Sequence, residues 1–75
     1  MNEKRRRKLK GAHDQLDSVI SSIEEVVDDE SDSLENTPES LQESDSFADR
    51  EDALDSLIDI LDDLKMSADS LRSYF

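Results

Sequence analysis

Two stretches of the chain place apolar residues at alternating steps of three and four, a spacing that puts side chains on one face of an α-helix. In the first stretch these positions are Leu9, Ala12, Leu16, Val19, Ile23 and Val26, and the neighbouring Ile20 and Val27 widen the stripe. The pattern predicts a first helix over residues 3–30.

The second stretch is the more regular of the two and predicts a helix over residues 47–73. Its apolar positions are Phe47, Leu54, Leu57, Leu61, Leu64, Ala68, Leu71 and Phe75, interrupted only by Arg50. Such a heptad spacing is typical of a coiled coil. Each helix would be about 40 Å long at a rise of 1.5 Å per residue, and matched lengths favour an antiparallel pair.

The sequence therefore predicts an all-α fold, in which residues 1–75 form one domain: an antiparallel, coiled-coil-like two-helix hairpin. The seam of this hairpin, or of an oligomer built from it, is expected to consist of Leu16, Val19, Ile23, Leu54, Leu57, Leu61, Leu64 and Leu71.

Between the helices, residues 31–46 form an acidic, serine-rich connector. Thr37 precedes the only proline and resembles the N-cap of a short helical turn that runs through Leu41. Leu34 and Leu41 would then cover the end of the hairpin core next to this connector. Ser46 is the expected N-cap of the second helix.

Several apolar residues lie beside the seam rather than on it: Ile20, Val27, Ile58 and Ile60. A two-helix hairpin has only one internal interface, so these side chains would stay exposed in a monomer. A chain of this length also buries only about 60% of the surface that its unfolded form exposes. We therefore expect a homodimer in which two hairpins form a four-helix bundle. The alternative is a monomeric hairpin whose connector covers the apolar surface.

The chain contains no cysteine, so neither a disulfide nor a thiolate metal site can stabilise it. No apolar stretch of the kind found in a signal peptide follows the basic residues at the start, and nothing approaches the length of a transmembrane helix. We therefore expect a cytoplasmic protein with no membrane partner.

The residues do not predict an enzyme. The one histidine, His13, falls off the predicted seam and is expected to be a solvated helix residue. Paired carboxylates acting as acid and base need two different environments, whereas those of this chain lie on faces predicted to be wet. Asp28, Glu30 and Asp32 alternate as in a calcium loop, but Ser33 stands where an EF-hand needs glycine. We expect no catalytic residue, no metal site and no cofactor.

Carboxylates dominate the charge of the chain. It has 21 acidic residues against nine Lys and Arg, for a net charge of −12, and 17 of the acids lie between Glu24 and Leu64. Arg50 is the only Lys or Arg in that region. Such a block of like charge weakens a compact state, which indicates that the chain uses the field it creates.

On the second predicted helix the aspartates from Asp45 to Asp62 advance by three or four residues, or about 4.5–6 Å along the helix axis. That separation is on the scale of phosphate spacing along a nucleic-acid strand. The expected partner contacts are Asp49, Asp52, Asp55, Asp59, Asp62 and Asp63, supported by Glu24, Glu25, Asp28 and Asp29. The alternative is that these acids only keep a small helical protein soluble.

Positive charge is concentrated near the N-terminus, in Lys4, Arg5, Arg6, Arg7, Lys8 and Lys10. These side chains could neutralise phosphates of RNA, DNA or anionic lipid. No aromatic residue lies nearby to stack on a base, and the chain as a whole is strongly negative. We do not expect direct nucleic-acid binding, and the basic end could instead contact an acidic surface of the same fold or of a second subunit.

The segment Leu34-Glu35-Asn36-Thr37-Pro38-Glu39-Ser40-Leu41-Gln42, together with the basic start of the chain, resembles a group of short phage and prophage proteins. Those proteins look like acidic helical hairpins with a central Phe-x-Asn-x-Pro-Glu-Ser-Leu-Gln segment. Leu34 stands in the phenylalanine position, which keeps an apolar side chain but loses the ring. The group has no settled common function, so the resemblance implies an origin in a mobile element and a structured connector, but not an activity.

Together these observations predict a small phage or prophage protein of the host cytoplasm that binds and inhibits a host nucleic-acid-binding protein or defence nuclease. The inhibition would be of the anti-CRISPR or anti-restriction type, with the carboxylates acting as a DNA mimic in a basic groove. The alternative is a helical adaptor or assembly factor that pairs its leucine seam with helices of a partner. A third possibility is a regulator that grips nucleic acid through residues 4–10.

Overall fold

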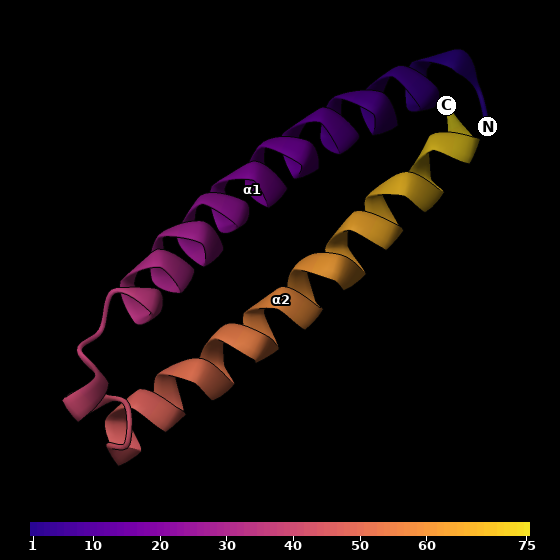
Figure 1. The fold of residues 1–75 in the computed structure, drawn as a ribbon. Coiled ribbons are helices and arrows are strands. Elements are labelled where there is room, and N and C mark those ends of the chain that lie inside the picture. The colour runs from indigo at the N-terminus through magenta and orange to yellow at the C-terminus, as the bar shows by residue number, and fades with distance from the viewer.

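A computed structural model describes residues 1–75 as two long antiparallel helices joined by a short connector (Figure 1). Helix α1 spans Glu3–Glu35 and helix α2 spans Asp45–Leu71. A single 3-10 turn, η1, occupies Glu39–Leu41 in the connector, and a second, η2, covers Arg72–Tyr74. The predicted all-α helical hairpin is thus confirmed.

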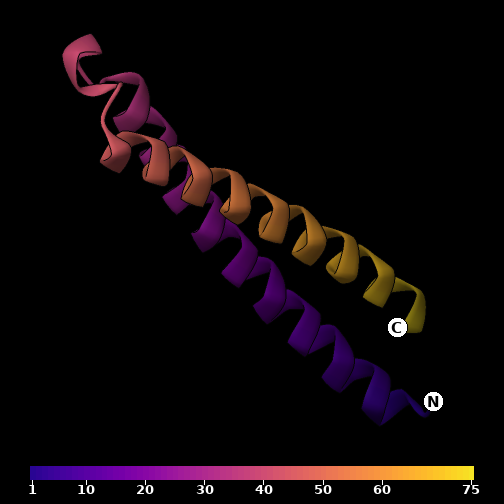
Figure 2. The same ribbon diagram turned by 90° about the horizontal axis from the view of Figure 1, so that it is seen from below.

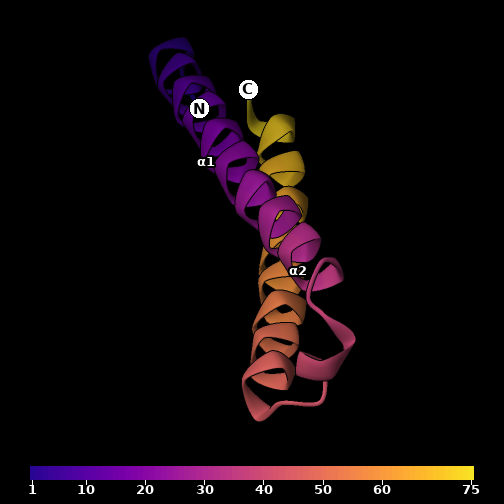
Figure 3. The ribbon, with the colours of Figure 1, turned by 60° about the vertical axis from the view of Figure 1, so that its left-hand side comes forward.

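The hairpin is a rod whose Cα atoms extend over 59 × 15 × 13 Å. Both termini lie at the end of the rod opposite the connector (Figure 1). Two further views show that the helices cross each other at an angle rather than lying parallel (Figure 2, Figure 3). We call the end with the termini the open end and the end with the connector the closed end.

The core contains one buried residue per seven along each helix. On α1 these residues are His13, Ile20, Val27 and Leu34, and on α2 they are Leu54, Leu61 and Ala68. They are between 4% and 9% exposed, and the chain has no other buried residue. Five half-buried apolar residues pack against them: Leu16, Ile23, Phe47, Leu57 and Leu64. The core is therefore a single file of side chains between two helices, as in a coiled coil.

On α1 two buried residues of the seam each come one position after a residue of the predicted stripe. Ile20 and Val27 are buried, although we expected them only to widen the stripe. Val19 is 51% exposed and Val26 is 56% exposed, so neither belongs to the core of the hairpin itself. Adjacent apolar residues satisfy two registers equally well, and the choice between them is made by packing against α2. Leu34, seven residues after Val27, continues the register that the fold uses.

Helix α1 is five residues longer than predicted and ends at Glu35 rather than at residue 30. Burial of Leu34 favours this extra turn, because it adds one more apolar layer to the core. Thr37 does not act as the N-cap of the following turn. Its hydroxyl donates a 2.9 Å hydrogen bond to the Ser33 carbonyl and so closes the end of α1. Pro38, which cannot continue the helical hydrogen bonding, follows directly.

Helix α2 begins at Asp45, two residues before the predicted start at residue 47, so Ser46 is not its N-cap. The N-cap is Ser44, whose hydroxyl oxygen accepts a 3.1 Å hydrogen bond from the Phe47 amide. The same hydroxyl donates to the Leu41 carbonyl at 2.8 Å and ties the connector to the helix. Of the two leucines expected to cover this end, Leu34 is buried but Leu41 is 56% exposed.

Arg50, the one polar interruption of the seam on α2, has a partner on α1. Its Nε donates a 2.9 Å hydrogen bond to Oε1 of Glu30, to which its second guanidinium nitrogen also donates. That nitrogen further donates to the Ser33 hydroxyl at 3.0 Å. The Arg50 and Glu30 side chains are 42% and 35% exposed, so their charges remain partly solvated. Arg50 thus interrupts the apolar seam with an ion pair that joins the two helices near the closed end.

Candidate functional site

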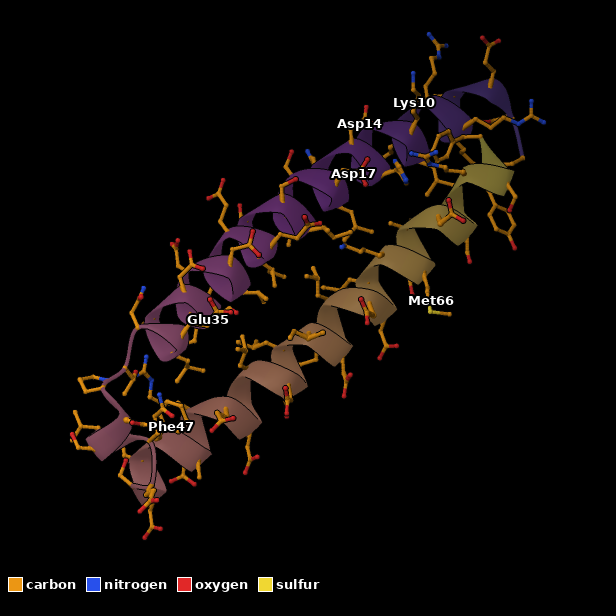
Figure 4. All side chains as sticks on the ribbon, viewed as in Figure 1. Lys10, Asp14, Asp17, Glu35, Phe47 and Met66 are labelled. Atoms are coloured by element: carbon orange, nitrogen blue, oxygen red, sulfur yellow. The ribbon has the colours of Figure 1, made fainter.

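The aspartates expected to contact a partner form a continuous stripe on α2. Asp49, Asp52, Asp55, Asp59, Asp62 and Asp63 are all exposed. At 100° per residue they fall within an arc of about 140°, centred opposite the buried leucines of this helix, and they span about 21 Å of its axis. Carboxylate oxygens accordingly project from α2 on the side away from α1 (Figure 4). We call this set the aspartate stripe.

No residue of the aspartate stripe has a partner within the chain. The ion pairs of the structure are Arg50 with Glu30 and Lys65 with Glu24, and the His13 ring lies near Asp14 and Asp17. None of the side-chain hydrogen bonds involves a stripe residue either. The stripe therefore presents its whole negative charge to solvent.

The acids of α1 do not join the aspartate stripe on one face. Glu24 is half-buried on a flank of the hairpin, where its carboxylate lies 3.3 Å from Nζ of Lys65. Glu25, Asp28 and Asp29 are exposed. Glu25 and Asp29 lie on the side of α1 opposite its buried residues, by the 100° rotation per residue. The hairpin thus carries acids on two opposite outer sides, and Glu24 is partly neutralised.

The basic residues from Lys4 to Lys10 lie on α1 at the open end, where Lys10 is labelled in Figure 4. None of them forms an ion pair with an acid of this chain. The suggested contact between the basic end and an acidic surface of the same fold is therefore not made within the hairpin. The rod is positive around the start of α1 and negative over most of its remaining length.

His13 is not the solvated histidine that we expected. It is 4% exposed and lies in the seam, seven residues before the buried Ile20. Its ring packs against the ring of Phe75, with a centroid distance of 5.1 Å and an interplanar angle of 59°. The seven-residue spacing from Ile20 is the sequence signal for this position, whereas the predicted stripe of Leu9, Ala12, Leu16, Val19, Ile23 and Val26 leaves His13 out.

The polar surroundings of His13 come mainly from α1. Nδ1 lies 3.6 Å from a carboxylate oxygen of Asp17 and 3.8 Å from one of Asp14. Nε2 is buried and has no hydrogen-bond partner. Beside the ring lies an open groove of about 390 Å³ between the helices, to which Asp69 and Arg72 of the second half also contribute. No sequence argument singled out this cluster.

Comparisons with protein-family models, with curated proteins and with solved structures found no match to this chain. Neither helix contains a stretch that is long and apolar enough to cross a membrane.

Proposed function

We propose that this chain is a small inhibitor from a phage or prophage that acts in the host cytoplasm by occupying the basic nucleic-acid-binding groove of a host protein or defence nuclease. The observation that supports this most directly is the aspartate stripe. Its six carboxylates are exposed, regularly spaced and free of ion pairs within the chain. A carboxylate set that only kept the protein soluble would not need such regular placement along one helix.

The distribution of acids around the rod also fits a groove that normally holds nucleic acid. A duplex carries its charge on the outside of a rod, on both strands. The hairpin likewise carries the aspartate stripe on the outer side of α2, with Glu25 and Asp29 on the outer side of α1. Aspartate holds its charge closer to the helix axis than glutamate would, so the charges are better fixed in position. Steering by this field would give fast capture, and binding would weaken as salt screens it.

The test begins by capturing host proteins on the immobilised chain and purifying the partner that salt elutes. Its binding is then measured with the wild type and with Asp52→Lys, Asp55→Lys and Asp59→Lys combined. The matched control reverses three glutamates outside the stripe, Glu35, Glu39 and Glu43. Each triple variant changes the net charge from −12 by six, to −6. Both should stay helical, because Lys is a better helix former than Asp, and the control residues lie at the end of α1 and in the connector.

If the proposal holds, the stripe variant binds at least tenfold more weakly than the control, and short duplex DNA competes with the wild type for the partner. Equal loss in both variants would show that only net charge matters. A partner that neither salt nor DNA displaces would contradict mimicry and would favour the adaptor alternative, in which apolar side chains make the contact.

We also propose that two hairpins associate into a four-helix bundle. The support is an apolar face formed by Val19, Val26 and Ile60, which are 51%, 56% and 52% exposed. Each lies one residue before a buried core residue, and equivalent register positions of antiparallel helices share a flank. The Glu24–Lys65 ion pair lies on the opposite flank, because both residues come four positions after a buried one. The register positions of the apolar flank hold only apolar residues or Ser between residues 12 and 33 and between residues 46 and 67, and Asp29 and Asp63 border the flank at the rim of the proposed bundle.

Sedimentation equilibrium tests the dimer directly. Val26→Asp combined with Ile60→Asp should shift the wild-type mass from twice that of the chain to that of a single chain. Met66→Asp, at a residue that is 69% exposed and lies off this face, should leave the mass unchanged. A wild type that sediments as a single chain at millimolar concentration would refute the bundle. The face would then be free for a helix of another protein, as the adaptor alternative requires.

A further inference from the structure

The environment of His13 is not explained by packing alone. The side chain is 5% exposed, yet neither ring nitrogen makes a hydrogen bond, and Nε2 is fully enclosed. A buried polar atom without a partner destabilises the folded state, which is why such atoms are rare in folded proteins. Every other buried residue of the chain is Ile, Val, Leu or Ala. A leucine at this position would complete the seam, so the histidine needs a separate reason.

The free nitrogen on the solvent side of the ring points at two carboxylates. Nδ1 lies 3.6 Å from Oδ2 of Asp17 and 3.8 Å from Oδ1 of Asp14, distances that are too long for a hydrogen bond. All three donor atoms lie within 4.8 Å of one another. Asp14 and Asp17 are labelled on α1 in Figure 4, toward the open end of the hairpin.

These separations suit a shared metal ion. An ion bound tetrahedrally at 2.0–2.2 Å holds its ligand atoms about 3.3–3.6 Å apart. The Nδ1–Asp17 distance falls at the upper end of that range and the Nδ1–Asp14 distance exceeds it by about 0.2 Å. The ligand atoms all lie within 4.8 Å of one another, so rotation of the exposed Asp side chains is needed to bring their oxygens together around one ion. His13 and Asp17 are four residues apart, so one turn of α1 brings both donors to the same side.

We propose that Nδ1 of His13 and the carboxylates of Asp14 and Asp17 bind one divalent transition-metal ion, with Zn²⁺ as the best match. One imidazole and two carboxylates suit Zn²⁺ better than Mg²⁺ or Ca²⁺, which prefer oxygen ligands alone. Packing against Phe75 holds the imidazole ring in place. Asp14 and Asp17 have side-chain exposures of 68% and 52%, so positions on the ion remain open to water.

Such an ion would act on the open end of the hairpin through the His13 ring. All three ligands belong to α1, and the link to the second half is the contact of His13 with Phe75, which follows η2. Fixing the ring through Nδ1 therefore fixes the surface on which Phe75 packs. The ion binds the folded arrangement of three residues, which the unfolded chain does not offer in advance, so it should raise thermal stability as its concentration rises.

The test is titration of the purified full chain with ZnCl₂, and in parallel with MgCl₂, by calorimetry and by NMR of the single histidine. The variants are His13→Leu and the pair Asp14→Asn with Asp17→Asn. The matched control is the pair Asp29→Asn with Asp32→Asn, which neutralises two exposed acids of α1 with the same i, i+3 spacing but no histidine beside them. Circular dichroism confirms that each variant folds before it is titrated.

We expect one Zn²⁺ per chain, a shift of the His13 ring signals on binding, and a melting temperature that rises with Zn²⁺ but not with Mg²⁺. His13→Leu and the Asp14/Asp17 pair should each weaken binding at least tenfold, and the control should not. Equal affinity of all variants would mean an adventitious ion only, held loosely by the acidic surface, and would overturn the proposal. Absence of Zn²⁺ binding up to millimolar concentration would overturn it as well.

Discussion

Replacing His13 with leucine should stabilise the hairpin in the absence of metal. The substitution removes a buried nitrogen that has no partner, which is worth about 1–3 kcal/mol. It also places leucine in register with Ile20, Val27 and Leu34, so the apolar file of α1 is extended by one layer. The contact between the His13 and Phe75 rings is lost, but leucine still covers the Phe75 ring.

For a domain of this size each kcal/mol shifts the melting temperature by about 4–8 °C. The expected rise for His13→Leu is therefore at least about 4 °C and reaches about 24 °C at the upper end of both ranges. The assay is thermal melting followed by circular dichroism at 222 nm, in buffer that contains EDTA so that bound metal does not contribute.

The matched control is Gln15→Leu, which adds a leucine at an exposed position of the same turn of α1. A surface substitution of this kind should change stability by no more than about 0.5 kcal/mol. A His13→Leu variant that melts below the wild type would refute the reasoning. It would show that Nε2 gains a partner in solution, or that the ring contact with Phe75 outweighs the cost of the buried nitrogen.

Three further substitutions test the fold, each by thermal or denaturant unfolding. Gly11→Ala should stabilise by about 0.5–1 kcal/mol, because the position is helical and an added Cβ would meet nothing within 4 Å; a loss of stability would contradict the helix at this point. Ser44→Ala should destabilise by about 1 kcal/mol by removing the N-cap of α2, whereas Ser46→Ala should be nearly neutral. A larger loss of stability in Ser46→Ala than in Ser44→Ala would show that Ser46 is the cap. Leu61→Ala should cost about 2–5 kcal/mol, since Leu61 is only 5% exposed, and a cost below 1 kcal/mol would mean that the seam is not packed as described.

The hairpin could be predicted from sequence because α2 has one clear register. Leu54, Leu57, Leu61 and Leu64 fit a single heptad pattern, and the structure uses it. Helix α1 offers two registers, since Val19 and Ile20 are both apolar and β-branched. Only packing against α2 decides between them.

The polar parts of the interface were harder to predict. His13 was set aside because a histidine does not count as an apolar seam residue, although its spacing from Ile20 fits. Glu30 was treated as part of the acidic field, because sequence alone does not show that Arg50, 20 residues away, reaches it. The aspartate stripe, by contrast, followed from the helix period alone, and all of its residues are exposed.

The single-file core has a consequence for how the hairpin opens. Each layer touches only the layers next to it, so no central cluster has to break before the rest can separate. The helices can separate layer by layer from the open end inward, while the connector holds them together at the closed end. Backbone amides of α1 should therefore exchange with deuterium fastest near Leu9 and slowest near Val27 and Leu34, in a gradient rather than at one common rate. His13 is the buried residue nearest the open end, so its contact with Phe75 is the first contact of a buried residue to break in that opening.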